Sequence, residues 1–344
     1  MKKSFISASV ATVLAAASFG ALADSPKVYG RVDLSVTNTE TGATLQGGTN
    51  GVTVGESGTY IENNFSHLGV KGSEKIADGV EMLYQMEFQV ENTSSKGDTF
   101  KARNTYLGVK TNAGTVLVGR NDTVFKQAEG GIDAFGNTNA DMDRMLTAQT
   151  RSADGFWYYS PKIADMLTLN ATYLVDDNNS TDGSLYALSA TLGDKKLKAQ
   201  NYYAAVAYNK GISGVDAYRA VAQVKMGDFK LGGLFQNAES VANNDVDGNT
   251  YIISGVYNLN GVNLKAQYGY DDAGFGKYYK NIGGVAGADD ISVTNYSVGA
   301  DYRVAKSTLV YGHYTHFEGD FKAAGAKVDL EDDNVFTVGV RYDF

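Results

Sequence analysis

The chain alternates hydrophobic and polar residues with a period of two, in segments of about ten residues that recur from residue 27 to the end. In the segment 28–37, Val, Gly and Leu occupy one face, and polar, charged and tyrosine side chains occupy the other. In the segments 262–271 and 334–344 one face is again apolar and the other polar, and their tyrosines lie on the apolar face. Such alternation predicts β-strands that have one apolar and one polar face.

Turn-forming residues separate these segments and define two kinds of connection. Short turns such as Gly193-Asp194 and Asn260-Gly261 favour tight hairpins. They alternate with long polar loops at 38–58, 122–150, 271–290 and 318–333. The pattern therefore predicts sixteen antiparallel strands, at 27–37, 59–71, 80–91, 101–111, 114–121, 151–160, 166–175, 184–192, 196–206, 217–226, 229–238, 249–258, 262–271, 291–303, 307–317 and 334–344.

A membrane barrel explains this pattern better than a soluble sandwich does. No run of 18 apolar residues follows Asp24, so no transmembrane helix is predicted. A barrel turns its apolar face to lipid and its polar face to a lumen, and it satisfies every backbone group between strands. Neither Pro26 nor Pro161 falls inside a predicted strand, and the 23 tyrosines suit a membrane interface. We predict an all-β fold, a transmembrane antiparallel β-barrel of sixteen strands; the alternative is a secreted β-rich binding protein.

The N-terminal segment has the pattern of a secretory signal peptide. Lys2 and Lys3 precede an apolar stretch at 10–22, and Ala21-Leu22-Ala23 supplies the small residues of a cleavage site. We expect residues 1–23 to be removed and residues 24–344 to form one barrel domain. Loss of the two lysines would take the formal net charge from −9 to −11.

Composition excludes several classes of function. The acidic balance, with a pI near 4.9, argues against a nucleic-acid-binding protein. The chain has no cysteine, which excludes disulfides, thiolate zinc sites and iron–sulfur clusters. His313 and His316 are three residues apart on a predicted strand and should point to opposite faces, so the histidines predict no metal site. Acidic loops at 176–179 and 332–333 could bind divalent ions loosely. No Gly-x-Ser-x-Gly motif occurs, and we predict neither an enzyme nor a cofactor.

Four short motifs and the last residue occur in an order typical of one family. They are Val28–Asp33, Ser66–Glu74, Gly114–Asp122, Tyr158–Pro161 and the terminal Phe344. Together they resemble the Gram-negative general porins over essentially the whole mature chain. This resemblance implies a sixteen-stranded homotrimer in the cell outer membrane, with the long loop 122–150 folded into the lumen as the third loop.

The resemblance also implies a function and a set of partners. The chain would be a general diffusion channel through which small hydrophilic solutes and ions pass passively, without a cofactor. It would contact outer-membrane lipid and lipopolysaccharide, and Phe344 would be the membrane-insertion signal read by the barrel-assembly machinery. The net charge of −11 favours a weak cation preference.

Selectivity would arise where the inward loop narrows the lumen. The family places basic side chains on the wall opposite acidic side chains of the loop, and their transverse field orients dipolar solutes. Two departures from the family pattern stand out: His67 replaces the usual arginine, and Ala134-Phe135-Gly136 replaces Pro-Glu-Phe-Gly. The predicted constriction residues are Arg31, His67, Arg103 and Arg151 on the wall, and Glu129, Asp133, Asp141 and Asp143 on the loop.

Other interpretations remain open from the sequence. Arg31 and Arg103 could be lumen charges away from the narrowest point, and strict alternation places Arg103 on one face with Leu107 and Val109. A solute-specific channel with a saturable binding site is the main functional alternative. An enzyme or an adhesin on a barrel scaffold is the third.

Overall fold

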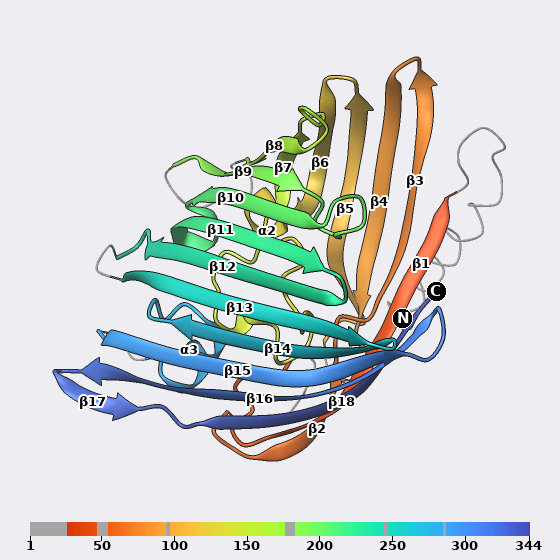
Figure 1. Ribbon diagram of the computed structural model, residues 1–344. Coiled ribbons are helices and arrows are strands. Elements are labelled where there is room, and N and C mark those ends of the chain that lie inside the picture. The colour runs from red at the N-terminus through yellow and green to blue at the C-terminus, as the bar shows by residue number, and fades with distance from the viewer. Residues whose placement is uncertain (1–25, 47–53, 94–96, 176–182, 244–245, 285–286) are drawn as a thin grey trace, which may run out of the picture.

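The computed structural model describes residues 26–46, 54–93, 97–175, 183–243, 246–284 and 287–344. The predicted signal peptide and the acidic loop at 176–179 lie outside these ranges. Within them, the chain forms one antiparallel sheet that closes on itself around a lumen (Figure 1). Among the described residues, no helix is both long enough and apolar enough to span a membrane.

Eighteen strands make up this sheet within the described residues. Their bounds are β1 (Lys27–Thr39), β2 (Gly58–Asn63), β3 (His67–Ala77), β4 (Val80–Val90), β5 (Phe100–Thr111), β6 (Gly114–Asp122), β7 (Arg151–Tyr159), β8 (Leu167–Leu174), β9 (Leu185–Gly193), β10 (Tyr202–Lys210), β11 (Val215–Met226), β12 (Phe229–Ser240), β13 (Asp247–Leu259), β14 (Val262–Asp271), β15 (Asp289–Arg303), β16 (Thr308–Ala323), β17 (Ala326–Asp329) and β18 (Asp333–Asp343).

These strands fill sixteen positions around the barrel, which confirms the predicted fold. β2 and β3 pair with successive parts of β1, so they are one broken strand. β17 and β18 likewise pair with successive parts of β16. The first and last strands close the ring, because β1 pairs with β18 from Arg31↔Asp343 to Thr39↔Val335. Figure 1 shows β1 and β18 side by side at this closure.

The two faces of the strands differ as the alternation predicts. On β1, Val32 and Val36 point outward and are 43% and 47% exposed, whereas Ser35 and Thr37 point into the barrel and are 3% and 0% exposed. The outward face of β18 continues this apolar surface with Val338, which is 64% exposed. A surface of this kind needs an apolar environment, and a bilayer supplies it.

The predicted strand at 196–206 and the turn before it differ from the structure. The strand expected at 196–206 is β10 at 202–210, and the expected Gly193-Asp194 turn is a longer connection over 194–201. Asp194 organises this connection by accepting hydrogen bonds from the backbone N–H groups of Lys196, Lys198 and Ala199. These backbone N–H groups lower the pKa of Asp194 to about 2. A local side-chain cap therefore replaced the tight turn that the dipeptide indicated.

The loop expected at 318–333 is in large part a hairpin. β16 continues to Ala323 and pairs with β17 through a turn at 324–325. A hairpin that projects beyond the membrane needs no apolar outer face. Its polar composition is therefore the same as that of a loop, and the sequence predicts a loop here. The other connection types agree with prediction, since short turns such as 112–113 alternate with long segments such as 123–150.

A β-bulge in β5 turns Arg103 into the lumen. The pairing with β4 skips a step, so that Arg103 and Asn104 both lie opposite Glu87. An extra residue of this kind reverses the alternation beyond it. Leu107 consequently faces outward and is 55% exposed, although strict alternation had placed it on the same face as Arg103.

Candidate pore constriction

The 28 residues from 123 to 150, here called the constriction loop, connect β6 to β7 and fold into the barrel. The loop begins with the one-turn helix α2 (Val124–Gln127), whose N-cap Thr123 accepts a hydrogen bond from the N–H of Lys126 at 3.2 Å. A 3-10 turn, η1 (Met142–Arg144), follows the tip, and its N-cap is Asp141. These two caps satisfy backbone donors that would otherwise be unpaired inside the barrel.

One side of the constriction loop packs against the inner wall of the barrel. Val124, Phe125 and Ile132 are at most 1% exposed and form one cluster with inward-facing residues of β7 to β13. Small residues on β10 and β11, such as Ala205 and Ala217, leave room for the loop on the lumen side. The wall residues of this cluster include Trp157, Leu174, Ala187, Tyr203, Ala205, Ala207, Ala217, Val221, Leu234, Ala238 and Ile252.

Polar side chains of the same wall hold the backbone of the loop. Tyr203 donates its hydroxyl to the carbonyl of Ala128 at 3.0 Å, and Gln223 donates Nε2 to the carbonyl of Gly131 at 2.8 Å. Arg219, which is 2% exposed, donates to the carbonyl of Phe125 at 3.2 Å and lies over its ring. Carbonyl groups removed from bulk water need hydrogen-bond donors. Side chains of β10 and β11 supply these donors to the backbone of the loop.

The tip of the loop is fixed at the place where the barrel closes. Asn139 is fully buried and donates Nδ2 to Glu62 at 2.7 Å and to Thr337 at 2.8 Å. Its Oδ1 therefore accepts from Nε2 of His313 at 2.8 Å. Gln46 adds a bond from Nε2 to the carbonyl of Thr138 at 2.8 Å. One asparagine of the loop is therefore hydrogen-bonded to residues of three strands, β2, β16 and β18.

The four predicted basic residues lie together on the lumen side of β1, β3, β5 and β7. Arg31 pairs with His67 across β1 and β3. His67 lies within electrostatic range of both Arg31 and Arg103. Arg151 lies within electrostatic range of Arg103. β3 lies across the ring from β11, whose Arg219 anchors the loop. The part of the loop that Arg219 holds therefore faces β3 across the lumen, whereas the base of the loop lies beside Arg151 and its tip reaches β2.

Each of the three arginines has a carboxylate partner on the wall. Arg31 contacts Asp343 at 2.7 Å through Nε. Arg103 contacts Glu87 at 2.6 Å, and Glu87 also accepts from the hydroxyl of Tyr29 at 2.8 Å.

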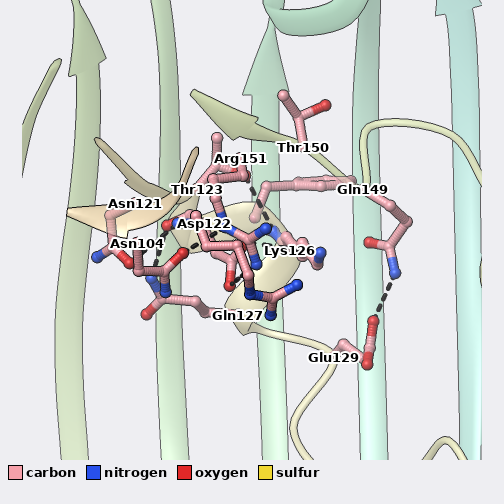
Figure 2. A network of polar contacts seen from close by, with 12 residues as sticks. Asn104, Asn121, Asp122, Thr123, Lys126, Gln127, Glu129, Gln149, Thr150 and Arg151 are labelled. Atoms are coloured by element: carbon pink, nitrogen blue, oxygen red, sulfur yellow. Dashed lines mark hydrogen bonds and ion pairs between the residues drawn. The ribbon is translucent and has the colours of Figure 1, made fainter. Parts of the chain in front are cut away.

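Arg151 lies at the base of the loop. It contacts Asp122 at 3.1 Å and donates to Asn104. Figure 2 shows Arg151, Asp122 and Lys126 gathered there, with the Glu129–Gln149 pair at some distance from them. Lys126 is 3.5 Å from Asp122, so two cations share this one carboxylate.

The predicted aspartates of the loop hold its own backbone. Asp133 accepts from the N–H of Phe135 at 2.8 Å. Asp141 accepts from the N–H of Asn137 at 2.6 Å and from that of Asp143 at 2.9 Å. Asp143 is paired with the neighbouring Arg144 at 2.7 Å. These groups lie close together on the loop, and each is partly committed to a local contact.

Their mutual repulsion and burial change their ionisation. Burial and the nearby Asp141 carboxylate raise the pKa of Glu129 to about 7, although Arg219 and the hydrogen bond from Gln149 oppose the shift. Burial raises the pKa of Asp143 to about 6. Burial also raises the pKa of Asp133, and the negative charge of Asp141 raises it further. The negative side of the lumen therefore carries less charge near neutral pH than the count of carboxylates suggests.

Sequence reasoning missed the acidic partners of the arginines and the anchors of the loop. Glu87 had a usable signal, because it lies on the polar face of the predicted strand 80–91 with Gln85 and Gln89. Arg219 had one too, since it interrupts an otherwise apolar inner face between Ala217 and Val221. What these residues contact could not be predicted, because a bulge in β5 brings Arg103 to Glu87, and the loop residues that Arg219 holds are far away in the chain.

Comparisons with known proteins agree with this architecture. A family model described as Gram-negative porin matches residues 10–322. The major outer membrane protein P.IB of Neisseria lactamica is 26% identical, and the alignment covers 100% of both chains. The porin-like protein L of Photobacterium profundum is 25% identical over 75% of each chain.

Solved structures with the same fold share little sequence. An anion-selective porin from Comamonas acidovorans has a TM-score of 0.72 at 18% identity, covering 93% of this chain and 99% of that one. The trimer form of OmpT, an outer membrane protein of Vibrio cholerae, has a TM-score of 0.68 at 19% identity, with the same coverage.

Proposed function

The chain belongs to the Gram-negative porin family and forms an outer-membrane channel for passive diffusion, and from that premise we propose that it is a general porin, a weakly selective channel for small hydrophilic solutes and ions. The observation that carries this proposal is the constriction loop, which is folded inside the barrel with the part that Arg219 holds facing a basic wall. The loop narrows the lumen.

The pairing of charges supports weak selectivity. Arg31, Arg103 and Arg151 each contact a carboxylate, so the basic wall presents little net charge to a passing ion. Glu129 is only partly ionised at neutral pH. The modest cation preference that we propose then comes from the acidic surroundings of the lumen rather than from its narrowest part. The constriction roles of His67, Asp133, Asp141 and Asp143 are part of the same proposal.

Assembly as a homotrimer is also proposed for this chain. The trimer form of the Vibrio cholerae neighbour supports it, as does family membership. Outer-membrane lipid and lipopolysaccharide would cover the rest of the exposed apolar face. The barrel-assembly machinery would read Phe344, which directly follows β18 and is 56% exposed.

Planar-bilayer recording of the purified protein tests the proposal. Insertion should give conductance in three equal steps, and asymmetric KCl should give a small reversal potential of the cation-selective sign. A reversal potential of the anion-selective sign would reject the ion preference. Conductance block that saturates with one solute would favour the solute-specific channel, and liposomes that fail to swell in small sugars would contradict the channel itself.

A further inference from the structure

Three side chains that can bind metal converge on the outer face of the barrel, at the rim that carries the long loops. His316 and Glu318 are two residues apart on β16 and therefore share a face. The register that pairs Phe317 with Asp333 brings Asp332 opposite Glu318. One nitrogen or oxygen atom from each of these three residues lies within 4.8 Å of the others.

A fixed amide determines which nitrogen of His316 carries the proton. Asn334 donates Nδ2 to the carboxylate of Glu40 at 2.6 Å, and a carboxylate can only accept. The Oδ1 atom of Asn334 therefore faces Nδ1 of His316, at 2.9 Å, and must accept from it. Because Nδ1 holds the proton, Nε2 of the neutral ring presents its lone pair.

That lone pair points at other acceptors. Nε2 of His316 is 3.7 Å from Oε2 of Glu318, and no hydrogen-bond donor contacts Nε2 in the described part of the chain. The imidazole cannot turn away, since His316 is 7% exposed and stacks on Tyr296 with ring centroids 4.7 Å apart. A proton or a metal ion held between Nε2 and the carboxylate of Glu318 would satisfy both groups.

The surroundings of these groups are acidic. Glu318 and Asp332 border an open pocket of about 750 Å³ whose lining includes six carboxylates and one lysine. The lysine, Lys327, is engaged by Asp320 and Asp329, at 3.3 Å and 2.9 Å. Glu318 and Asp332 have no lysine partner within the described residues, and both are exposed, so their side chains can close around an ion.

We propose that His316, Glu318 and Asp332 form a binding site for a divalent transition-metal ion of the Zn²⁺ type. An imidazole combined with two carboxylates suits such an ion, whereas Ca²⁺ and Mg²⁺ prefer oxygen ligands alone. Water would complete the coordination. The ion would connect β16 to the segment between β17 and β18, where the sheet is interrupted. Asn334 is the positioning residue, because its contact with Nδ1 orients the ring.

Calorimetric titration of chelator-treated, detergent-solubilised full-length protein with ZnCl₂ tests the proposal. We expect one Zn²⁺ per chain for the wild type. His316→Gln should weaken binding by at least about tenfold, and Asn334→Leu should weaken it by about 10- to 100-fold. Glu331→Gln is the matched control, because Glu331 lines the same pocket without belonging to the ligand set, and it should bind Zn²⁺ like the wild type.

Three outcomes would overturn the site. Unchanged Zn²⁺ affinity in His316→Gln would show that the imidazole is not a ligand. An equal loss in Glu331→Gln, or competition by Ca²⁺ as strong as by Zn²⁺, would reduce the site to a non-specific acidic patch. The ¹⁵N signals of the His316 ring can be compared in the wild type with and without Zn²⁺. If Zn²⁺ leaves them unchanged, Nε2 binds only a proton and not the metal ion. This last measurement needs no variant and therefore does not depend on how a variant folds.

Discussion

Arg103 is the residue whose replacement should change ion selectivity most directly. It reaches the lumen through the bulge in β5 and contacts Glu87 at 2.6 Å. In Arg103→Gln the positive charge is lost and Glu87 keeps its negative charge, so permeability should shift toward cations. A unit charge 4 Å away in water contributes about 1 kcal/mol, which limits the shift to about fivefold.

Reversal potentials in asymmetric KCl measure this shift. The double variant Arg103→Gln/Glu87→Gln is the matched control, because it removes both charges and should restore the wild-type ratio. An unchanged ratio in the single variant would mean that Arg103 does not line the narrow part of the lumen.

Glu129 should make selectivity depend on pH. Its pKa, raised to about 7, leaves it mostly protonated at about pH 6 and mostly ionised at about pH 8. Cation preference should therefore increase between these pH values in the wild type, and the increase should be smaller in Glu129→Gln, in which Asp133 and Asp143 still titrate. A wild-type ratio that does not change over this range would contradict the expectation.

The same shift affects the packing of the loop with a defined sign. A carboxyl whose pKa is raised on folding favours the folded state while it is protonated. The stabilisation is complete below the ordinary pKa of 4.5 and is lost as the pH rises through about 7. The constriction loop should accordingly be held more firmly on the acid side of neutrality, and hydrogen exchange of the loop amides at the two pH values would measure the difference.

At the scale of elements, the constriction loop depends on its buried tip. In Asn139→Ala, buried His313 loses its partner and Glu62 loses one of its donors, and an unmade bond of this kind costs about 1–3 kcal/mol. The tip should detach while the strands persist. Single-channel conductance should increase and become noisier, and the barrel should melt at the wild-type temperature.

The control for this loop variant is Asn112→Ala, an exposed change in the short turn between β5 and β6. It should leave conductance unchanged. If Asn139→Ala had a quiet, wild-type conductance, the packing against β7 to β13 alone would be sufficient to hold the loop.

At the scale of the whole molecule, the last residue completes the ring. The backbone of Phe344 exchanges hydrogen bonds with Gly30 at 3.0 Å and 3.1 Å, and its ring lies so close that a Cβ at Gly30 would be 2.4 Å from it. Gly30 is thus the residue that lets the terminal aromatic ring lie against the first strand.

Phe344→Ser should reduce the amount of folded barrel in the outer membrane, because both this packing and the proposed assembly signal are lost. Tyr342→Ser, on the same outward face two residues earlier, is the control and should have a smaller effect. Quantifying heat-modifiable barrel in membrane fractions compares the two. Equal losses would mean that the general aromatic surface matters rather than the terminal position.

The sequence by itself determined the barrel, because alternation, turn residues and strand length are local properties. The faces of β1 and β18 follow the printed alternation, and thirteen of the sixteen predicted strands begin and end within two residues of the observed ones. Of the other three, 59–71 is broken into β2 and β3, 196–206 is displaced to β10, and 307–317 is extended to Ala323. The resemblance also pointed to Arg31, His67, Arg103 and Arg151, which the structure brings together on one wall. The two wrong predictions, at 194–201 and 324–325, also have local causes. Polar residues form a side-chain cap in the first segment and a projecting hairpin in the second, and composition alone does not distinguish either of them from an ordinary turn or loop.

Only the tertiary structure decided what the charged residues contact. Arg103 meets Glu87 because a bulge shifts one strand by a residue, and Asn139 meets His313 across 174 positions of the chain. The tertiary structure also decided what lies near His316. Glu318 is two residues along β16 on the same face, and Asp332 comes from the segment between β17 and β18. Alternation determines which face a side chain occupies except where a bulge intervenes, as it does in β5. Closure of the ring and the inward course of one loop determine the neighbours of that side chain, and both depend on contacts between segments that are distant in sequence.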